Sequence, residues 1–370
     1  MGHLTRWFIA VALANLPLIG NAEILIGQIT GVTGPIAASS KEALAGTHLY
    51  LNGINAKGGL FGEKIELLVM DDKFDPKLSA PAAETLIREK NVLALFMNRG
   101  TEHVEAALPL MAQYGVPLIA PTSGATQLRK PVNKLIFNLR ASHQHEAQKI
   151  IAHLKLIGVT RIALVYVDDN FGNDILEGAQ KGFTEHGIKP VASIKVPRDK
   201  VDLAGIVTEI AKSDAQSVVW VGAAAIVSSG VKALRAAGSG VQVLTLSNNA
   251  SSGFIKMLGD QAQGVVVAQV FPSERSFAYS VIREAQDAAK KAGIESLSPI
   301  AMEGFIGAKL LVEALRRAGP RPTRESLVKS LNSMRRFDLG GLEINYSADD
   351  HSGLDYVELS IIGADGKFKR

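Results

Sequence analysis

The chain has 370 residues, of which 47% are hydrophobic, and this length and composition suit two compact domains rather than one. It contains no cysteine, which excludes disulfide bonds, thiolate metal sites and a cysteine nucleophile. The formal net charge is only +4 and charges of both signs are interspersed, so we expect no nucleic-acid partner.

The first segment, residues 1–22, has the pattern of an export signal. A positive charge at Arg6 precedes a mostly apolar run, Trp7–Ile19, and the small residues Gly20 and Ala22 suit a cleavage site. The apolar run is too short for a membrane span, which needs roughly 20 residues. We therefore expect cleavage near Ala22 and a periplasmic protein, without a lipid anchor because no cysteine follows the cleavage site.

From residue 23 onwards, short apolar runs alternate with amphipathic stretches. Several runs are almost continuous Val, Ile and Leu, as is typical of strands buried on both faces of a parallel sheet. The predicted strands are Ile24–Thr30, Ile65–Met70, Leu93–Phe96, Pro117–Ala120, Arg161–Val167, Val191–Val196, Ser217–Gly222, Val241–Ser247 and Gly264–Val270. The predicted helices include Pro76–Lys90, Glu102–Tyr114, Glu146–Leu156, Asp174–Glu185, Leu203–Lys212 and Ser276–Ala292. This alternation predicts an α/β fold with doubly wound parallel sheets.

So many strands fit two smaller sheets, in two lobes, better than one large sheet. No linker rich in Pro, Gly or Ser separates two halves of the chain, so segments of ordinary composition must connect the lobes. The best candidates for these crossings are residues 140–142, 268–271 and 339–342, the last of which reads Leu-Gly-Gly-Leu.

Fragments that imitate catalytic or cofactor-binding motifs have simpler interpretations. Gly58–Gly62 lacks the spacing of a dinucleotide-binding loop and precedes a strand, which indicates a turn. The segment 143–146, His-Gln-His-Glu, lacks a zinc-binding spacing and more simply surrounds a helix start. Asp71 and Asp72 could form a carboxylate pair, but a turn that caps the next helix is the simpler interpretation. The sequence thus predicts no catalytic residue, no metal site and no cofactor.

Three predicted loops follow the carboxyl ends of strands, where open α/β sheets bind their ligands. They span residues 31–35, 98–101 and 121–126, and each combines glycine with Thr or Ser. Glycine lets a ligand approach the backbone, and hydroxyl groups beside the free N–H groups of a helix N-terminus suit a carboxylate. Helix capping by the same residues is the alternative interpretation.

Six short motifs follow one another between residues 23 and 340. They are Gly31–Pro35 (GVTGP), Leu51–Phe61 (LNGINAKGGLF), Asp71–Lys77 (DDKFDPK), Gly115–Ser123 (GVPLIAPTS), Arg161–Gly172 (RIALVYVDDNFG) and Val231–Gly238 (VKALRAAG). This ordered set resembles the periplasmic solute-binding proteins of ABC importers, in the group typified by the leucine/isoleucine/valine-binding protein.

The resemblance implies a type I periplasmic binding fold, in which two doubly wound α/β lobes joined by three crossovers close over a ligand by hinge bending. Lobe 1 should hold residues 23–142 and 270–340. Lobe 2 should hold residues 143–269 and 341–370. The partners implied are a small-molecule ligand and, transiently, a membrane ABC permease.

The resemblance also implies where the ligand binds. Thr101 matches the hydroxyl residue that binds the ligand's carboxylate in this family. Thr122, Ser123 and Gly124 match a segment of lobe 1 that supplies backbone and hydroxyl groups to the same carboxylate.

Five further positions belong to the site that the resemblance implies, and three of them, Arg99, Ala223 and Ser247, depart from the branched-chain amino acid binder. Ser39 stands at an aromatic wall position and Arg99 at an apolar one. Phe171 keeps the ring of a tyrosine without its hydroxyl, and Ala223 replaces a second tyrosine. Ser247 stands about where the relative has the glutamate that pairs with the ligand's ammonium group. Burying an ammonium without a carboxylate is costly, on the order of several kcal/mol.

These departures predict a carboxylate ligand bulkier than leucine and without an amino group, such as an aromatic or branched organic acid. An amino acid is the alternative, with Asp168, Asp169 or Glu102 as the partner of its ammonium group, although the two aspartates more simply cap the next helix. We expect a monomeric component of an importer. A sensor component of the same fold is an alternative, and an enzyme is a weaker one because no loop supplies a nucleophile or an acid–base pair.

Overall fold

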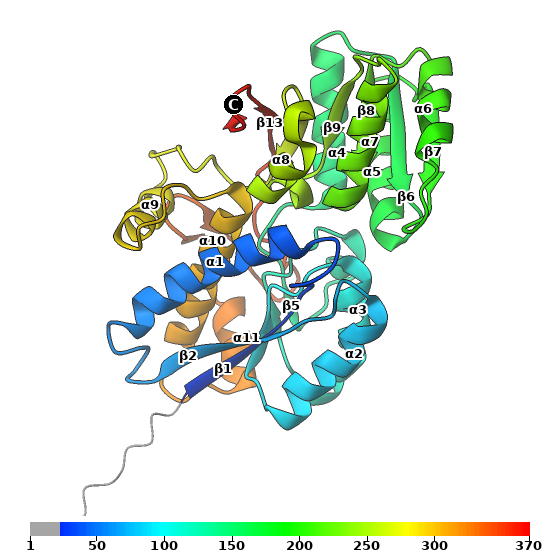
Figure 1. Cartoon of the computed structure of the whole chain (residues 1–370). Helices are drawn as coiled ribbons and strands as arrows, with labels where there is room; N and C mark the ends of the chain where they lie inside the picture. Colours follow the sequence, from blue (N-terminus) through cyan, green and yellow to red (C-terminus); the bar gives the residue numbers. More distant parts are fainter. Residues whose placement is uncertain (1–22) are drawn as a thin grey trace, which may run out of the picture.

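The computed structural model describes residues 23–370, which form two lobes, each built on its own sheet (Figure 1). The predicted α/β class with parallel sheets is confirmed. The predicted export signal, residues 1–22, lies outside the described residues. Within residues 23–370, none of the helices has the length and apolar character needed to cross a membrane.

Lobe 1 contains a parallel sheet with the strand order β2–β1–β3–β4–β5. Its strands are β1 (Glu23–Ile29), β2 (Lys64–Met70), β3 (Ala94–Phe96), β4 (Leu118–Ile119) and β5 (Ile136–Phe137). The helices of this lobe are α1 (Ala37–Asn55), α2 (Pro76–Glu84), its continuation η1 (Thr85–Glu89), α3 (Thr101–Tyr114), η2 (Thr126–Leu128), α9 (Ser280–Lys291), α10 (Pro299–Ala318) and α11 (Arg324–Asn332). Because the strand order reverses at β1, the loops after β1 and β3 flank the crevice where such sheets bind ligands.

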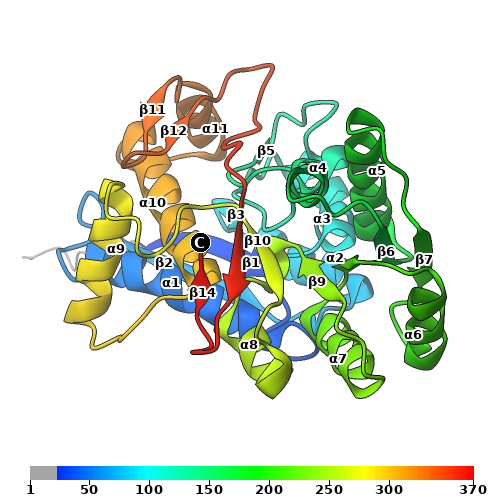
Figure 2. The same ribbon diagram turned by 90° about the horizontal axis from the view of Figure 1, so that it is seen from above.

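Lobe 2 contains a sheet with the strand order β14–β13–β10–β9–β8–β6–β7. The parallel strands are β6 (Ile162–Val167), β7 (Ala192–Val196), β8 (Ser217–Val221), β9 (Gln242–Thr245) and β10 (Val266–Gln269). The C-terminal strands β13 (Glu358–Ile362) and β14 (Phe368–Lys369) add to β10 in antiparallel orientation, as Figure 2 shows. The helices are α4 (His143–Leu156), α5 (Asn170–Glu185), α6 (Leu203–Lys212), α7 (Ala224–Ala236), η3 (Ser247–Asn249), α8 (Ser252–Leu258) and η4 (Gly259–Gln261).

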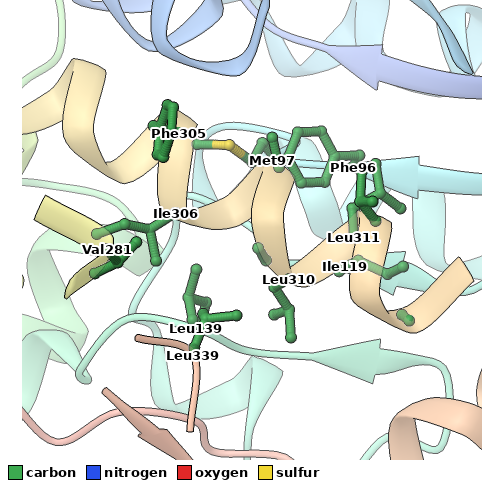
Figure 3. Close-up of a cluster of buried hydrophobic side chains, with 14 of the residues drawn as sticks. Phe96, Met97, Ile119, Leu139, Val281, Phe305, Ile306, Leu310, Leu311 and Leu339 are labelled. Atoms are coloured by element: carbon green, nitrogen blue, oxygen red, sulfur yellow. The ribbon is translucent and has the colours of Figure 1, made fainter. Parts of the chain in front are cut away.

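Helix α10 forms the centre of the lobe 1 core. Most of its residues are buried, and apolar side chains from the sheet, from α9 and from the segment after β11 (Phe337–Asp338) surround it. Figure 3 shows this cluster with Phe96, Met97, Ile119, Leu139, Val281, Phe305, Ile306, Leu310, Leu311 and Leu339 labelled. Because α10 packs against the lobe 1 sheet, it fixes the position of the sheet whose loops line the site.

Helices α1 and α10 cross at two glycines. A Cβ atom on Gly46 would lie 1.8 Å from the main-chain oxygen of Ala301, and one on Gly304 would lie 2.0 Å from that of Ala43. Only glycine permits so close an approach of two helix backbones.

The chain crosses between the lobes three times. It leaves the lobe 1 core after Ala141 and enters α4 of lobe 2 at His143. It returns after β10, because Val270 and Phe271 already pack in the lobe 1 core. These two crossings lie within the segments 140–142 and 268–271, or at their edge.

The third crossing lies later than residues 339–342. Gly340 and Gly341, with φ of 105° and 94°, make the turn of a hairpin between β11 and β12 (Glu343–Ile344). Downstream of the hairpin, Tyr346 donates a hydrogen bond to the main-chain oxygen of Asn138 at 2.6 Å, and Leu354 still packs in the lobe 1 core. Residues 341–354, assigned to lobe 2 from the sequence, therefore pack with lobe 1.

Candidate ligand-binding site

A cavity of about 610 Å³ lies between the two lobes, large enough for a small organic molecule. Lobe 1 contributes residues 35–36, 73–77, 99–101 and 122–123, which follow the carboxyl ends of β1, β2, β3 and β4. Lobe 2 contributes His143 together with residues that follow β6, β7, β8 and β9, namely Asp169, Phe171, Arg198, Asp199, Ala223, Ile226 and Asn248, as well as Val167 at the end of β6.

The N-terminus of α3 supplies the polar end of the cavity. Its N-cap residue, Gly100, has a φ of 98° and gives no side-chain cap, so the N–H groups of the first helical turn keep their free donor capacity. The hydroxyl groups of Thr101 and Ser123 lie 3.0 Å apart, and both residues line the cavity. Thr122 holds the two loops together, since its N–H donates to the main-chain oxygen of Asn98 at 3.0 Å. Donors and a positive helix end gathered in this way suit a carboxylate.

A buried cluster of Asp72, Ser79 and His103 supports this end of the cavity. Ser79 Oγ and Asp72 Oδ2 both contact the same ring nitrogen, His103 Nδ1, at 3.0 and 2.7 Å. Phe74 stacks on the imidazole with ring centroids 4.5 Å apart and forms part of the cavity wall. Because the carboxylate and the hydroxyl share one nitrogen and are fully buried, the cluster positions Phe74 and is no nucleophile–base pair.

Arg99 brings a buried positive charge to the cavity. The residue is 6% exposed, and its Nη2 donates to the main-chain oxygen of Asn248 in lobe 2 at 3.0 Å. Among residues 23–370, Nη1 has no hydrogen-bond partner. Burial lowers the pKa of Arg99 to about 10, and the carboxylates of Glu303 and Glu42 only partly offset this effect. The guanidinium is therefore charged at neutral pH and short of an anionic partner.

Arg198 forms ion pairs with two of the three carboxylates that could bind a ligand's ammonium group. Its guanidinium, in lobe 2, forms ion pairs with Glu102 of lobe 1 and with Asp169, the latter at 2.6 Å. Asp169 also caps α5 by accepting from the N–H of Gly172 at 2.7 Å. The third candidate, Asp168, pairs with the exposed Lys195 at 2.9 Å and does not line the cavity.

His143 and Phe171 form the lobe 2 wall near the start of α4. Their rings meet edge to face with centroids 5.0 Å apart. The Nε2 atom of His143 accepts from the N–H of Gly124 at 2.9 Å, so the ring proton is on Nδ1, which lies 3.3 Å from a carboxylate oxygen of Glu146. His143 is thus held in the wall by neighbours on both sides and is not a solvated residue at a helix start.

The structure brings most of the site residues expected from the sequence together in one cavity. Those that line it are Arg99, Thr101, Thr122, Ser123, Phe171 and Ala223. Ser39, Gly124 and Ser247 do not line it.

Each of these three residues is buried behind the wall. The Ser39 hydroxyl donates to the main-chain oxygen of Ile36 at 3.0 Å, within the first turn of α1. Gly124 packs against His143, whose Nδ1 a Cβ atom would approach to 2.9 Å. Ser247 contacts Arg140 through its hydroxyl, and its N–H donates to Glu146 at 2.9 Å. The next residue, Asn248, reaches the cavity instead.

Sequence reasoning missed the turn 73–77 and the pair Arg198-Asp199. Both follow the carboxyl ends of strands, β2 and β7, so the rule that identified the other loops also applied to them. The turn was interpreted only as structural, and Asp75 indeed caps α2 by accepting from the N–H of Lys77 at 3.0 Å. The expected turn at Asp71 and Asp72 is present, with both carboxylates accepting from main-chain N–H groups.

Comparisons with known proteins agree with this two-lobed arrangement. Residues 23–366 match the family model described as periplasmic binding protein. A Leu/Ile/Val-binding protein homolog 7 of Brucella suis biovar 1 is 25% identical over 332 residues, which cover 85% of this chain and 82% of the relative.

Two solved structures are similar over nearly the whole chain. A substrate-binding periplasmic protein from Ralstonia solanacearum is 32% identical, has a TM-score of 0.85, and is matched over 94% of this chain and 99% of its own. A possible leucine/isoleucine/valine-binding protein from Rhodopirellula baltica SH 1 is 25% identical with a TM-score of 0.88, over 95% and 97% of the two chains. The chain therefore belongs to the type I periplasmic binding proteins of the Leu/Ile/Val-binding family, which are solute-binding proteins and not enzymes.

Proposed function

We propose that this protein is the exported solute-binding component of an ABC importer and that it binds a small organic acid without an ammonium group. The observation that carries the proposal is the charge distribution of the cavity. The cavity offers hydroxyl groups, a helix N-terminus and a buried guanidinium, whereas its buried carboxylate, Asp169, is already paired with Arg198.

The carboxylate of the ligand binds at the start of α3. The hydroxyl groups of Thr101 and Ser123 donate to it, and the uncapped first turn of the helix adds N–H donors. Charge-assisted hydrogen bonds of this kind are about twice as strong as neutral ones.

An α-ammonium group finds no comparable partner. The other acidic residues of the cavity wall, Asp75 and Asp199, are exposed, and Asp75 caps α2. Glu102 is bound by Arg198 and by the N–H of Asn170 at 3.1 Å. An amino acid in this cavity would leave its ammonium group desolvated and unpaired, at a cost on the order of several kcal/mol.

The small residue Ala223 and the ring of Phe171 leave room for a ligand bulkier than leucine, such as a branched or aromatic acid. The expected export signal, the absence of cysteine and the family support a periplasmic location without a lipid anchor. The partner is a membrane permease, which the monomeric, ligand-loaded protein contacts through both closed lobes.

A thermal-shift screen of refolded, ligand-free protein tests the ligand class. The panel pairs each amino acid with the acid of the same carbon skeleton, for example leucine with 4-methylpentanoate and phenylalanine with 3-phenylpropanoate. A ligand at 100 times its Kd adds about 2.7 kcal/mol to the stability, which raises the Tm by several degrees. We expect the acids to raise the Tm. Shifts from the amino acids alone would contradict the proposal.

A further inference from the structure

We propose that Arg99 binds a second acidic group of the ligand, so that the protein is a receptor for a small dicarboxylate. The inference rests on the proposed function, because it takes the first carboxylate to bind at the start of α3. It adds a chemical class of ligand and names the residue that selects it.

Arg99 has a terminal nitrogen without a hydrogen-bond partner among residues 23–370. A guanidinium has five N–H donors in a planar fork that matches a carboxylate. In the described chain, Arg99 uses Nη2 for one neutral acceptor, the main-chain oxygen of Asn248 at 3.0 Å, and leaves Nη1 unbonded. No carboxylate within residues 23–370 lies in ion-pair distance of it, although the residue is only 6% exposed and lines the cavity.

The other two buried arginines of the described chain, Arg140 and Arg129, use both of their terminal nitrogens. Arg140 lies 2.9 Å from Glu146 and 3.5 Å from Glu303. Arg129 donates to the main-chain oxygens of Ser352 and Arg140 at 2.8 and 2.7 Å, so both of its terminal nitrogens are used. Arg99 is the buried arginine of the cavity wall, and one of its terminal nitrogens has no partner in the described chain.

The guanidinium of Arg99 lies where the two lobes meet. Arg99 immediately precedes Gly100, yet its side chain extends across the cleft to the main chain of lobe 2. The hydroxyl groups of Thr101 and Ser123 remain on lobe 1. The cavity wall thus contains two groups that suit an anion, the Arg99 guanidinium beside the main chain of lobe 2 and the hydroxyl pair of lobe 1, and a ligand with two acidic groups could use both.

The charge of Arg99 also affects the closure of the cleft. Closing the lobes buries the charge of Arg99 against a single carbonyl oxygen, and an unpaired buried charge opposes closure. A carboxylate that arrives with the ligand compensates this charge. Arg99 would then select dicarboxylates because the second acidic group makes closure of the lobes more favourable.

Calorimetric titration with matched pairs of probes tests this assignment. The diacids are adipate and terephthalate, and the monoacids are hexanoate and 4-methylbenzoate, in which a methyl group replaces the second carboxylate. For the wild type we expect the diacids to bind about tenfold or more tightly than the monoacids. Arg99→Met, which keeps much of the volume, should abolish this preference, because it should weaken the binding of the diacids about tenfold more than that of the monoacids. Arg99→Lys should retain part of it.

Thr101→Ala serves as the reference variant, because it should weaken diacids and monoacids alike. Circular dichroism and urea unfolding establish that each variant is folded. If Arg99→Met does not fold, the loss of part of the diacid preference in Arg99→Lys still tests the assignment. Equal affinities of diacids and monoacids for the wild type would overturn the assignment. An equal loss of affinity for diacids and monoacids in Arg99→Met would also overturn it. Arg99 would then be a contact between the lobes, or a second group that binds the same carboxylate as Thr101. In either case the monoacids still bind, whereas binding of amino acids alone would contradict the proposed function itself.

Discussion

The hydroxyl of Thr101 is the single group whose loss should affect binding most directly. Thr101→Ala should weaken the binding of carboxylate ligands by about 1–3 kcal/mol, because a donor is removed from a desolvated anion. Stability should change little, since within residues 23–370 the hydroxyl makes a single hydrogen bond, to Ser123 at 3.0 Å. Ser39→Ala is the matched control, because that hydroxyl bonds within α1 and does not line the cavity. Equal affinities of the two variants in calorimetry would place the carboxylate elsewhere.

The sequence predicted the polar end of the site well and its lobe 2 wall less well. Thr101 and Ser123 follow clear strand–loop–helix boundaries, so the strand-end rule places them. After β9, the resemblance to the family placed Ser247 in the site, but a short helical turn there directs Ser247 to Arg140 and Asn248 to the cavity. A shift of one residue in the turn decides which side chain reaches the cavity, and no periodicity in the sequence reveals that shift.

At the scale of elements, a buried ion-pair network joins the two lobes near the first crossing. Arg140 contacts Glu146 at the start of α4 and Glu303 in α10. Burial alone would raise the pKa of Glu146, but the charge of Arg140 and the hydrogen bond of His143 lower it to about 2. The folded state therefore binds fewer protons than the unfolded chain between about pH 4.5 and pH 2.

The stabilisation from Glu146 should accordingly be complete above pH 4.5 and should be lost as the pH falls towards 2, by roughly 3 kcal/mol in all. Urea unfolding of the wild type and of Glu146→Gln between pH 6 and pH 2.5 measures this. The variant should be less stable at pH 6, and the difference should shrink as the pH falls. A difference that stays constant over this range would contradict the assigned pKa.

Arg198 forms a second link between elements of the two lobes, because it joins the start of α3 to the cap of α5. Its side chain is 31% exposed, so the pairs should contribute at most about 1 kcal/mol and be weakened by salt. Arg198→Gln should speed the release of a bound acid by up to about fivefold at low salt and less at high salt. Lys195→Gln, which breaks a pair within lobe 2, is the control, measured by stopped-flow dissociation. Identical release rates for the two variants would rule out this role.

Most elements could be predicted from the sequence because their patterns are strong. The parallel strands β6 and β8 are fully buried, and all their residues except Ser217 are apolar. The hairpin β11–β12 and the C-terminal strands were missed because they are short and partly exposed, so they show little hydrophobic signal. The segment around Gly340 and Gly341 was assigned as a crossing between the lobes, but it is the turn of a hairpin within lobe 1. Glycines mark a turn without indicating which lobe contains it.

At the scale of the whole molecule, the fold and the family establish a solute-binding protein, and the distribution of charge around its cavity is the basis of the proposed ligand class. The two lobes meet at the cavity through Arg99 and Arg198, both cations, while the acidic groups near the site are paired or exposed. An anion without a positive charge of its own fits this distribution.

Calorimetric titration of the wild type with 4-methylpentanoate and with leucine tests this central claim most directly, since the two molecules differ by the ammonium group alone. We predict that the acid binds at least about tenfold more tightly, a difference of about 1.4 kcal/mol. Tighter binding of leucine would mean that a carboxylate of the cavity, with Asp169 the first candidate, is available to an ammonium group, and the account of the charge distribution would be wrong.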